Sequence, residues 1–259
     1  MTFALVPPHS GYHMKGRRAG FEGWYKRLTL PEYGESFGFI YSIFDPADEK
    51  SSRHGCEAQV VGPDEGYVWR TGSAAKRFWA DEHDFRLGHV FDGVAFSRPT
   101  PFNAFERFAR EGFQLTGHSH QGIIGDARWC YNVRPLMGWG GGASARQFST
   151  AGWLAALPVF EPHYQVLMAH GLASGFVEWQ GSRFDFVDAP AYAEKNWGGS
   201  FPKQWWWLQC NSFDGQDVLS VTSAGGARGN PLLPGRTEDV ALVAVHTAAG
   251  EFFPFPDVE

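Results

Sequence analysis

The feature that most limits how this chain can fold is a long succession of short runs in which apolar and polar residues alternate. Examples lie at 21–30, 36–45 and 183–189, and each is closed within a residue or two by Pro or Asp. A period of two is typical of half-buried strands, and runs of this length between breakers favour antiparallel pairing. The sequence therefore predicts an all-β protein.

Glycine marks several of the expected connections. In residues 177–187, Gly181-Ser182 separates two alternating segments, which predicts a tight hairpin turn at that pair. The glycine-rich stretches 138–144 and 223–230 have no alternating pattern of apolar residues. We expect both of these stretches to be loops.

One helix interrupts the predicted strands. Thr100 is suited to the N-cap and Pro101 to the first helical position, and Gly112 is suited to end the helix. The residues between them place aromatic side chains at helical spacing, namely Phe102, Phe105 and Phe108. This pattern predicts about three helical turns.

Charge and cysteine content exclude several classes of protein. The net charge is -6 and the 22 Lys and Arg residues are scattered, which argues against a nucleic-acid-binding surface. The 3 cysteines show no CxxC spacing, so neither a disulfide framework nor a zinc site is predicted, and a reducing compartment fits best. The first residues lack a charged segment followed by an apolar run, so we do not expect secretion.

Signatures of nucleotide and nucleophile chemistry are also missing, since neither GxxxxGK[ST] nor GxSxG occurs. His118 and His120 would share one face of a strand, but no acidic residue or third histidine lies near them in the sequence. We interpret them as paired surface or packed histidines, and the sequence predicts no metal site and no cofactor.

Aromatic content is high, at 16% of residues with 11 Trp and 23 Phe. A well-packed β core explains part of this content, and a pocket for a large apolar ligand would explain it equally well. Composition alone leaves both explanations open.

Several collinear segments combine Trp, Gly and charged residues in a specific order. They are PPHSGYH (7–13), FEGWYKRLTLPEYGESFGFIYSIFDP (21–46), TAGWLAALPVFEPHYQVLMAHG (150–171) and YAEKNWGGSFPKQWWWLQCNSF (192–213). Together they resemble the tocopherol cyclase family through nearly the whole chain.

The resemblance implies two lipocalin-like antiparallel β-barrels packed together, related to carotenoid hydratases and lipocalin-type cyclases, with a ligand cavity in or between them. Residues 1–185 would form the first barrel and residues 186–259 the start of the second. Members of the family usually continue well beyond this length, so we expect the second barrel to be incomplete.

The resemblance also implies a function: cofactor-independent closure of the chroman ring of a prenylated benzoquinol in vitamin E biosynthesis. The enzyme would be associated peripherally with the thylakoid membrane or with lipid globules. Ring closure of this kind protonates an alkene, forms a tertiary carbocation and adds a phenol oxygen to it, and no electrons are transferred. The proton donor should be a carboxylic acid kept neutral by apolar surroundings.

Glu194 is the first candidate for this acid, because it stands among aromatic residues in the fourth segment and an acidic residue occupies the corresponding place in the related hydratases. The alternative is a structural ion pair between Glu194 and Lys195. Glu22 is the second candidate, with Trp24 on its own strand face and Tyr25 on the other.

The remaining candidates would hold the substrate. Tryptophan faces stabilise cations best, and polar side chains can bind the quinol hydroxyl groups or satisfy buried backbone. A histidine of the first segment could carry a proton at the pocket mouth or cap a loop. The predicted substrate contacts are Trp24, Tyr25, Trp197, Trp205, Trp206, Trp207, Asn196, Gln209, Asn211, Tyr41, His9 and His13.

Two other functions fit the same residues. A barrel lined by Trp and Phe could carry an isoprenoid lipid without catalysis, and a hydratase or another cyclase could use the same acid on a different isoprenoid. A carboxylic acid inside the pocket would distinguish an enzyme from a carrier, because a carrier gains nothing from burying one.

Overall fold

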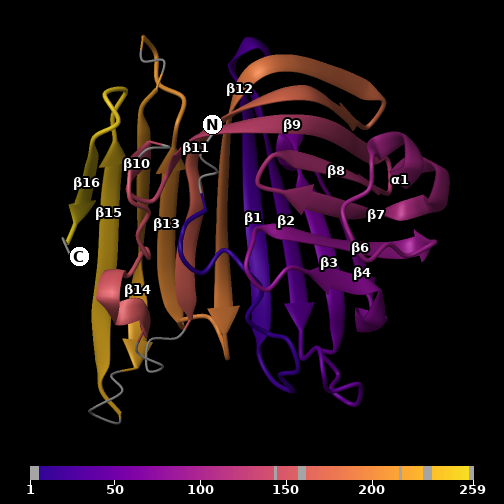
Figure 1. Cartoon of the computed structure of the whole chain (residues 1–259), viewed down its shortest axis with the longest axis horizontal. Coiled ribbons are helices and arrows are strands. Elements are labelled where there is room, and N and C mark those ends of the chain that lie inside the picture. The colour runs from indigo at the N-terminus through magenta and orange to yellow at the C-terminus, as the bar shows by residue number, and fades with distance from the viewer. Residues whose placement is uncertain (1–5, 143–144, 157–161, 216–217, 230–234, 257–259) are drawn as a thin grey trace.

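The computed structural model describes most of the chain, in the ranges 6–142, 145–156, 162–215, 218–229 and 235–256. Within these ranges the chain forms two sheets, one of 12 strands and one of 4. Figure 1 shows the larger sheet curling through the right-hand part of the molecule, with the strands of the smaller sheet at the left. The predicted all-β class is confirmed. Part of the third family segment, 157–161, lies outside the described residues.

The larger sheet has the spatial order β4-β3-β2-β1-β12-β11-β9-β8-β7-β6-β5, and β10 pairs with β9. Its strands are β1 (Phe21–Leu30), β2 (Glu35–Phe44), β3 (Gly55–Val61), β4 (Tyr67–Gly72), β5 (Phe78–Ala80), β6 (Arg86–Gly93), β7 (Ala109–Thr116), β8 (Ser119–Ile124), β9 (Ala127–Gly138), β10 (Gly141–Gly142), β11 (His163–Trp179) and β12 (Ser182–Gly198). The smaller sheet consists of β13 (Gln204–Cys210), β14 (Ser220–Gly229), β15 (Thr237–His246) and β16 (Phe252–Phe255). One α-helix is described, α1 (Phe102–Phe108), with short 3-10 turns at Pro31–Tyr33, Pro63–Glu65, Ala75–Arg77 and Gly152–Ala156.

Strand β12 lies at the centre of the larger sheet and pairs with β1 on one side and β11 on the other. In the pairing with β1, Glu194 is opposite Tyr25 and Lys195 is opposite Trp24. Successive side chains of a strand point to opposite faces, yet every residue from Ala191 to Lys195 is buried. Both faces of the sheet are therefore covered at this point.

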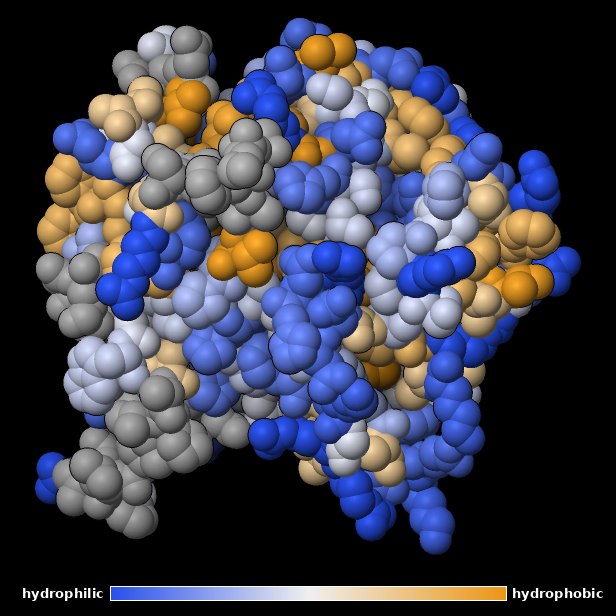
Figure 2. Space-filling view, in the orientation of Figure 1, coloured by the Kyte–Doolittle hydropathy of each residue, from blue (hydrophilic) through white to orange (hydrophobic). Residues whose placement is uncertain are grey.

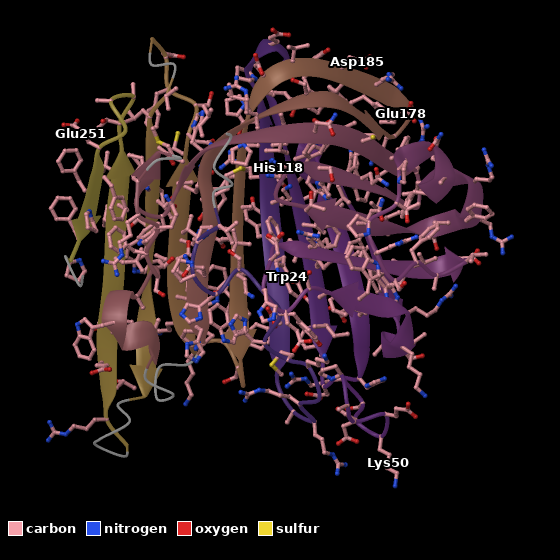
Figure 3. All side chains as sticks on the ribbon, in the orientation of Figure 1. Trp24, Lys50, His118, Glu178, Asp185 and Glu251 are labelled. Atoms are coloured by element: carbon pink, nitrogen blue, oxygen red, sulfur yellow. The ribbon has the colours of Figure 1, made fainter. Side chains whose placement is uncertain are left out.

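Two apolar cores cover these faces. The first lies inside the curled sheet and includes Trp24, Phe39 and Trp129. The second lies where β9, β11 and β12 meet the smaller sheet, and it includes Tyr192 and Ala244. Figure 3 shows Trp24 near the middle of the molecule, on β1. The alternation along β12 thus divides its side chains between two separate interiors.

The expected domain boundary between residues 185 and 186 falls inside β12, which continues to Gly198. The chain leaves the larger sheet after that residue, and the smaller sheet begins at Gln204. The division of the chain into domains stays a prediction.

The predicted hairpin in residues 177–187 is present as the β11–β12 connection, but its turn lies one residue earlier than predicted. The turn residues are Gln180 and Gly181, with φ angles of 49° and 83°. Positive φ at both central positions is the primed geometry that matches strand twist. Ser182 already pairs with Trp179 as the first residue of β12.

The predicted helix is present but shorter. Its N-cap is Pro101, not Thr100, and no side chain caps it. It ends at Phe108 because Ala109 takes an extended conformation and starts β7, so Gly112 lies within a strand. Two of the three predicted aromatic residues face the protein, since Phe105 is buried in a small core under the helix and Phe102 packs against that core. The third, Phe108, is exposed.

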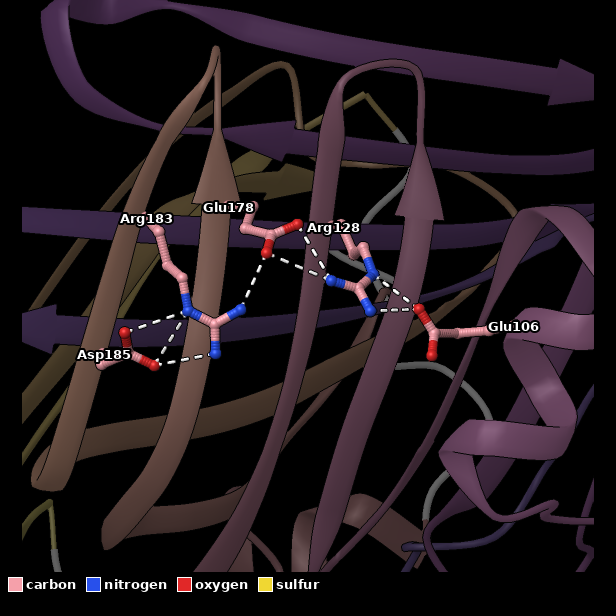
Figure 4. Close-up of polar contacts among 5 residues, drawn as sticks. All are labelled: Glu106, Arg128, Glu178, Arg183 and Asp185. Carbon is pink, nitrogen blue, oxygen red and sulfur yellow. Dashed lines mark hydrogen bonds and ion pairs between the residues drawn. The ribbon is translucent and has the colours of Figure 1, made fainter.

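An ionic chain fixes α1 to the curled sheet (Figure 4). The Arg128 guanidinium donates to Glu106 on α1 and to Glu178 on β11, at 3.0 Å from Nη1 to Oε2 of Glu178. Arg183 donates to Glu178 and to Asp185 near the tip of the β11–β12 hairpin. All these groups are part-exposed or exposed, so these ion pairs orient α1 on the sheet but add little stability.

The expected loop at 223–230 is wrong over most of its length, because residues up to Gly229 belong to β14. The glycines serve close packing there. A Cβ at Gly225 would lie 2.6 Å from Cε2 of Trp206 on the neighbouring strand. Glycine thus leaves room for an indole ring to lie across β14.

The stretch at 138–144 begins as the tight β9–β10 connection, and residues 143–144 lie outside the described ranges.

Candidate functional site

A cavity of about 980 Å³ lies between the two sheets. Strands β1, β2 and β12 of the larger sheet form one side and strands β13 to β16 the other, with residues near 148–152 at its border. Its size is that of pockets for large small-molecule ligands. The predicted site residues that line it are Trp24, Tyr25, Glu194, Asn196, Trp197, Trp205, Trp206 and Trp207.

Glu194 is held in the cavity wall by three hydrogen bonds, and it is only 6% exposed. The hydroxyl groups of Tyr164 and Tyr192 each donate to its Oε2 at 2.6 Å. The indole Nε1 of Trp207 donates to the same oxygen at 2.9 Å. Because all three donors act on Oε2, the carboxyl group has a fixed orientation.

Three different elements supply these donors. Tyr192 precedes Glu194 by two residues on β12, so alternation places both side chains on one face. Tyr164 comes from β11, which pairs with β12. Trp207 comes from β13, so its hydrogen bond connects the smaller sheet to the larger one.

The electrostatics of Glu194 combine two opposing effects. Burial raises the pKa of its carboxyl group, and the hydrogen bonds from Tyr164, Tyr192 and Trp207 lower it by a smaller amount. Burial also raises the pKa values of Tyr164 and Tyr192 well above the usual value, so both hydroxyls keep their protons. The group is therefore an acid whose conjugate base already has its hydrogen-bond donors in place.

Aromatic rings surround this carboxyl group. The ring of Tyr25 packs edge-on against Trp207 with 5.3 Å between centroids, and burial raises the pKa of Tyr25 to about 12. Trp205 and Trp206 lie farther out along β13 and are 61% and 47% exposed. The tryptophan run thus extends from the buried acid to the surface of the molecule.

The other face of β12 carries a separate polar cluster. The buried Nζ of Lys195 forms an ion pair with Glu22, and it lies 3.0 Å from Nδ1 of His13. Glu22 Oε2 also accepts the backbone N–H of His13 at 2.7 Å. The suggested ion pair between Glu194 and Lys195 is therefore wrong, because consecutive residues of a strand point to opposite faces.

Trp197 lies between two imidazole rings at the cavity edge. The ring of His13 stacks on it at 4.2 Å, and the ring of His163 stacks at 4.9 Å. His9 packs against the same indole at 5.6 Å. Burial lowers the pKa of His9, and the nearby His13 and Lys195 lower it further. These contacts hold the chain before β1 against β12.

The remaining predicted contacts do not line the cavity. Tyr41 is fully buried in the first core, where its hydroxyl is hydrogen-bonded to Nε2 of His120. The amide of Asn211 donates to the backbone oxygen of Ala191 at 2.9 Å. Gln209 is buried, and its side-chain amide has no partner among the described residues. Glu22, His9 and His13 are likewise absent from the cavity wall that the structure describes.

The site also contains three residues that were not predicted from the sequence, namely Tyr164, Tyr192 and His163. Alternation from Glu194 could have identified Tyr192, which is two residues away on the same strand. Tyr164 and His163 become neighbours of the site only through the register of β11 on β12, where His163 is opposite Trp197.

Within the described ranges, no group of three or more His, Cys, Asp and Glu side chains is placed to hold a metal ion. The same part of the chain contains no helix long and apolar enough to cross a membrane.

The fold and the site together define a class: antiparallel β proteins with a large, aromatic-lined cavity between two sheets and one buried, hydrogen-bonded carboxyl group in its wall. Comparison with known proteins narrows the class to a family. The family model described as tocopherol cyclase-like matches residues 18–259. The chain belongs to this family.

Named relatives agree with that assignment. "Tocopherol cyclase, chloroplastic" from Zea mays is 43% identical over 282 residues, which cover 97% of this chain and 59% of the relative. "Probable tocopherol cyclase, chloroplastic" from Oryza sativa subsp. japonica is 42% identical with the same coverage. The chain thus spans about three fifths of the length of these curated relatives.

A solved structure assigned to AttH from Nitrosomonas europaea shares the fold, with a TM-score of 0.54 and 17% identity. The similarity covers 97% of this chain and 74% of that one. At this identity the likeness concerns the fold alone.

Proposed function

We propose that this chain carries the chemistry of a tocopherol cyclase, the acid-initiated closure of the chroman ring of a phytyl benzoquinol. The observation that supports this most directly is the buried Glu194 carboxyl group, with three donors on its Oε2, in the wall of a large aromatic cavity. The plant relatives named as tocopherol cyclases support the substrate class.

In the first step, protonated Glu194 transfers its proton to the trisubstituted alkene of the substrate. The alkene becomes a tertiary carbocation, and Glu194 becomes a carboxylate. Hydrogen bonds from Tyr164, Tyr192 and Trp207 stabilise that carboxylate more than they stabilise the neutral acid. The donors therefore act on the charge that develops in the transition state.

In the second step, a phenol oxygen of the quinol adds to the carbocation and closes the ring, and its proton returns to Glu194. The product is an isomer of the substrate, and the oxidation state does not change. The aromatic faces of Trp207 and Tyr25 border the region where the cation forms. Asn196 shares the strand face of Glu194 and is suited to hold a quinol hydroxyl.

The apolar tail supplies most of the binding energy in this proposal. A tail of about twenty carbons, at ~0.8 kcal/mol for each buried CH₂, offers a gross gain of more than ~10 kcal/mol before the costs of binding. A cavity of about 980 Å³ with aromatic walls suits such a tail. Few polar contacts are then needed at the head group.

We further infer peripheral contact with thylakoid membranes or lipid globules, by way of exposed apolar side chains at the cavity border. Trp205, Trp206 and Phe201 are exposed there, and tryptophan favours membrane interfaces. Figure 2 shows further apolar residues over the outer strands of the smaller sheet, where Phe253 and Phe255 are exposed.

The double variant Trp205→Ser/Trp206→Ser should float less with galactolipid vesicles than the unmodified protein does, and equal flotation would contradict this contact.

The test of the proposed reaction uses Glu194→Gln, which keeps the shape of the side chain but removes the proton donor. With a phytyl benzoquinol, we expect loss of chromanol formation by about 10²-fold or more, with quinol binding nearly unchanged. The matched control is Glu32→Gln on the exposed turn after β1, which should turn over normally. Wild-type rates in Glu194→Gln would remove that residue from the acid role.

Product analysis separates the alternatives. Tight quinol binding without turnover by the unmodified protein would indicate an isoprenoid carrier. A product heavier by one water would indicate a hydratase acting through the same acid. A chromanol of unchanged mass, formed without added cofactor, is the result that the proposal expects.

A further inference from the structure

The large cavity contains a cation that the proposed reaction does not use. Arg27 is the last residue of β1 that lines this cavity, and it is the only Lys or Arg among the described lining residues. Its Nη1 donates to the backbone oxygen of Gln209 at 3.3 Å. No carboxylate forms an ion pair with Arg27 in the part of the chain that the structure describes. A guanidinium has five N–H donors, so donors remain for an oxygen of a bound molecule.

The hydroxyl group of Tyr25 lies beside this cation. Tyr25 and Arg27 are two residues apart on β1, so both side chains are on the cavity face. The Tyr25 ring lies over Gly38 of β2, where an added Cβ would be 3.4 Å from Oη of Tyr25. Gly38 is directly opposite Arg27 in the strand register, so the tyrosine ring leans along β1 toward the guanidinium. Burial raises the pKa of the Tyr25 hydroxyl, and the charge of Arg27 acts in the opposite direction.

Arg27 and Tyr25 together complement a hydroxyl group. The hydrogen bonds described around Glu194 do not use the Tyr25 hydroxyl, so it is available to a bound molecule. A phenol hydroxyl has one donor hydrogen and acceptor lone pairs. It can therefore accept a hydrogen bond from the Arg27 guanidinium and donate one to Oη of Tyr25. An apolar isoprenoid tail offers neither kind of group, so this part of the cavity suits an oxygen-bearing head group.

The strand register fixes how far this pair lies from the acid. Glu194 is opposite Tyr25, and Tyr192 is opposite Arg27. The backbone positions of Glu194 and Arg27 therefore differ by two residues, about 6.6 Å along the strands. A 1,4-quinol ring with both of its oxygens has a similar length. One quinol oxygen can thus lie near Glu194, within reach of Asn196 on the same strand face, while the other oxygen lies at Arg27.

In the opposite direction along β1 the cavity wall is apolar. The next lining residues after the level of Glu194 are Gly23 and Phe21. The ring of Phe21 stacks on that of Phe201 at 4.9 Å, and Phe201 packs against the exposed Trp205 at 6.2 Å. This part of the wall suits an isoprenoid tail, and it leads to the exposed aromatic border of the cavity.

We propose that Arg27 and Tyr25 form the subsite for the second hydroxyl of the quinol, the one that stays free when the ring closes. This inference rests on the proposed function and adds the orientation of the substrate to it. The free hydroxyl lies at Arg27, the alkene at Glu194, and the tail runs toward Phe21 and Phe201. The chain therefore selects prenylated 1,4-quinols over prenylated phenols that lack the second hydroxyl.

The experiment measures binding separately from turnover. A phytyl benzoquinol and the matching phytyl phenol without the second hydroxyl are titrated into the full chain, with quenching of tryptophan fluorescence as the readout. A hydrogen bond to a charged group is strong enough to favour the quinol by about tenfold or more in Kd. An unmodified protein that binds both ligands equally well would overturn the proposal.

Variants assign the preference to the two side chains. Arg27→Met keeps an unbranched apolar side chain in the wall and should lose most of the preference for the quinol, with the Kd for the phenol nearly unchanged. Tyr25→Phe keeps the ring and should lose part of the preference. The matched control is Arg134→Met, because Arg134 on β9 is exposed and pairs with Asp188 at 3.8 Å, and it should keep the full preference. A full preference in Arg27→Met, or an equal loss of affinity for both ligands, would overturn the proposal.

Product analysis on the same two ligands distinguishes this proposal from the proposed reaction. A preference for the quinol that depends on Arg27, without formation of chromanol, would support the subsite and contradict the cyclase activity. Ring closure of quinol and phenol with equal kcat/KM would support the cyclase activity and overturn the subsite. Failure of the unmodified protein to bind the quinol would overturn both.

Discussion

Glu194 and Lys195 are consecutive in the sequence, but they serve two different interiors. Glu194 Oε2 accepts the indole N–H of Trp207 at 2.9 Å in the cavity between the sheets, whereas Lys195 pairs with Glu22 inside the curled sheet. A single strand that is buried on both faces produces this separation. Among the described residues, the Glu194 carboxyl group therefore has no ion-pair partner, although the adjacent Lys195 amine pairs with Glu22.

The first prediction concerns Tyr164, which positions and tunes Glu194. Tyr164→Phe removes one of three donors to the carboxylate, and a hydrogen bond to a charged group contributes about 1.5–3 kcal/mol. We expect the apparent pKa of Glu194 to rise and kcat for ring closure to fall about tenfold or more, with little change in quinol binding. The measurement is the pH profile of kcat.

Tyr33→Phe is the matched control, because the Tyr33 hydroxyl donates to the backbone of Asp185 far from the cavity. Its pH profile should coincide with that of the unmodified protein. A fall in kcat without any displacement of the pH profile in Tyr164→Phe would indicate a packing role for Tyr164 only.

The second prediction distinguishes the two carboxyl groups named from the sequence. Glu22→Gln leaves Lys195 buried without its carboxylate, and breaking a buried pair in this way costs about 3–5 kcal/mol of folding free energy. Glu22→Gln/Lys195→Met removes both charges and should recover most of that loss. Denaturant unfolding measures both values.

Activity per folded molecule is the second readout for these variants. Because Glu22 does not line the cavity among the described residues, turnover by the folded fraction should stay near that of the unmodified protein. Loss of turnover in a fully folded double variant would restore Glu22 as a candidate for the proton donor.

Much of this architecture could be predicted from the sequence, because it follows from local patterns. Period-two runs predicted strands such as 21–30 and 36–45, and both are present almost as predicted. The aromatic environment of Glu194 could be predicted too, since Trp207 follows in the same segment. Strand alternation was enough to place Glu22 and Trp24 on one face.

What the sequence did not reveal depends on register between distant strands. Tyr164 reaches Glu194 only because β11 pairs with β12, and Lys195 meets Glu22 across 173 residues. A loop was predicted at 223–230 because glycine has a low propensity for strands. At Gly225, however, the strand requires glycine, because the ring of Trp206 on the neighbouring strand leaves no room for a Cβ.

The third prediction follows from the linkage between folding and the ionisation of Lys26, which is buried on β1 without a hydrogen-bond partner among the described residues. Burial lowers its pKa in the folded chain to about 7, from the usual value of 10.5, so between these values the unfolded chain binds one more proton. Stability should therefore rise with pH across this window, by up to about 1.4 kcal/mol for each pH unit. Below about pH 7 the group is protonated in both states and adds no slope.

The measurement compares the unmodified protein with Lys26→Met at pH 7 to 9.5. The variant should be more stable at pH 7, and the difference should shrink as pH rises. His120, Tyr131 and Tyr41 face the same region, but they are present in both proteins, so the difference isolates Lys26. A constant difference across the range would contradict the depressed pKa.

The last prediction tests whether Gly225 is there to accommodate the Trp206 ring. A Cβ at Gly225 would meet the indole at 2.6 Å, whereas nothing lies within 4 Å of a Cβ at Gly229 on the same strand. Gly225→Ala should therefore cost about 1–3 kcal/mol through overpacking and should alter the fluorescence of the exposed tryptophans. Gly229→Ala should leave both stability and fluorescence nearly unchanged. If the two variants behaved alike in denaturant unfolding, the glycine at 225 would reflect strand composition and not the packing of the indole against β14.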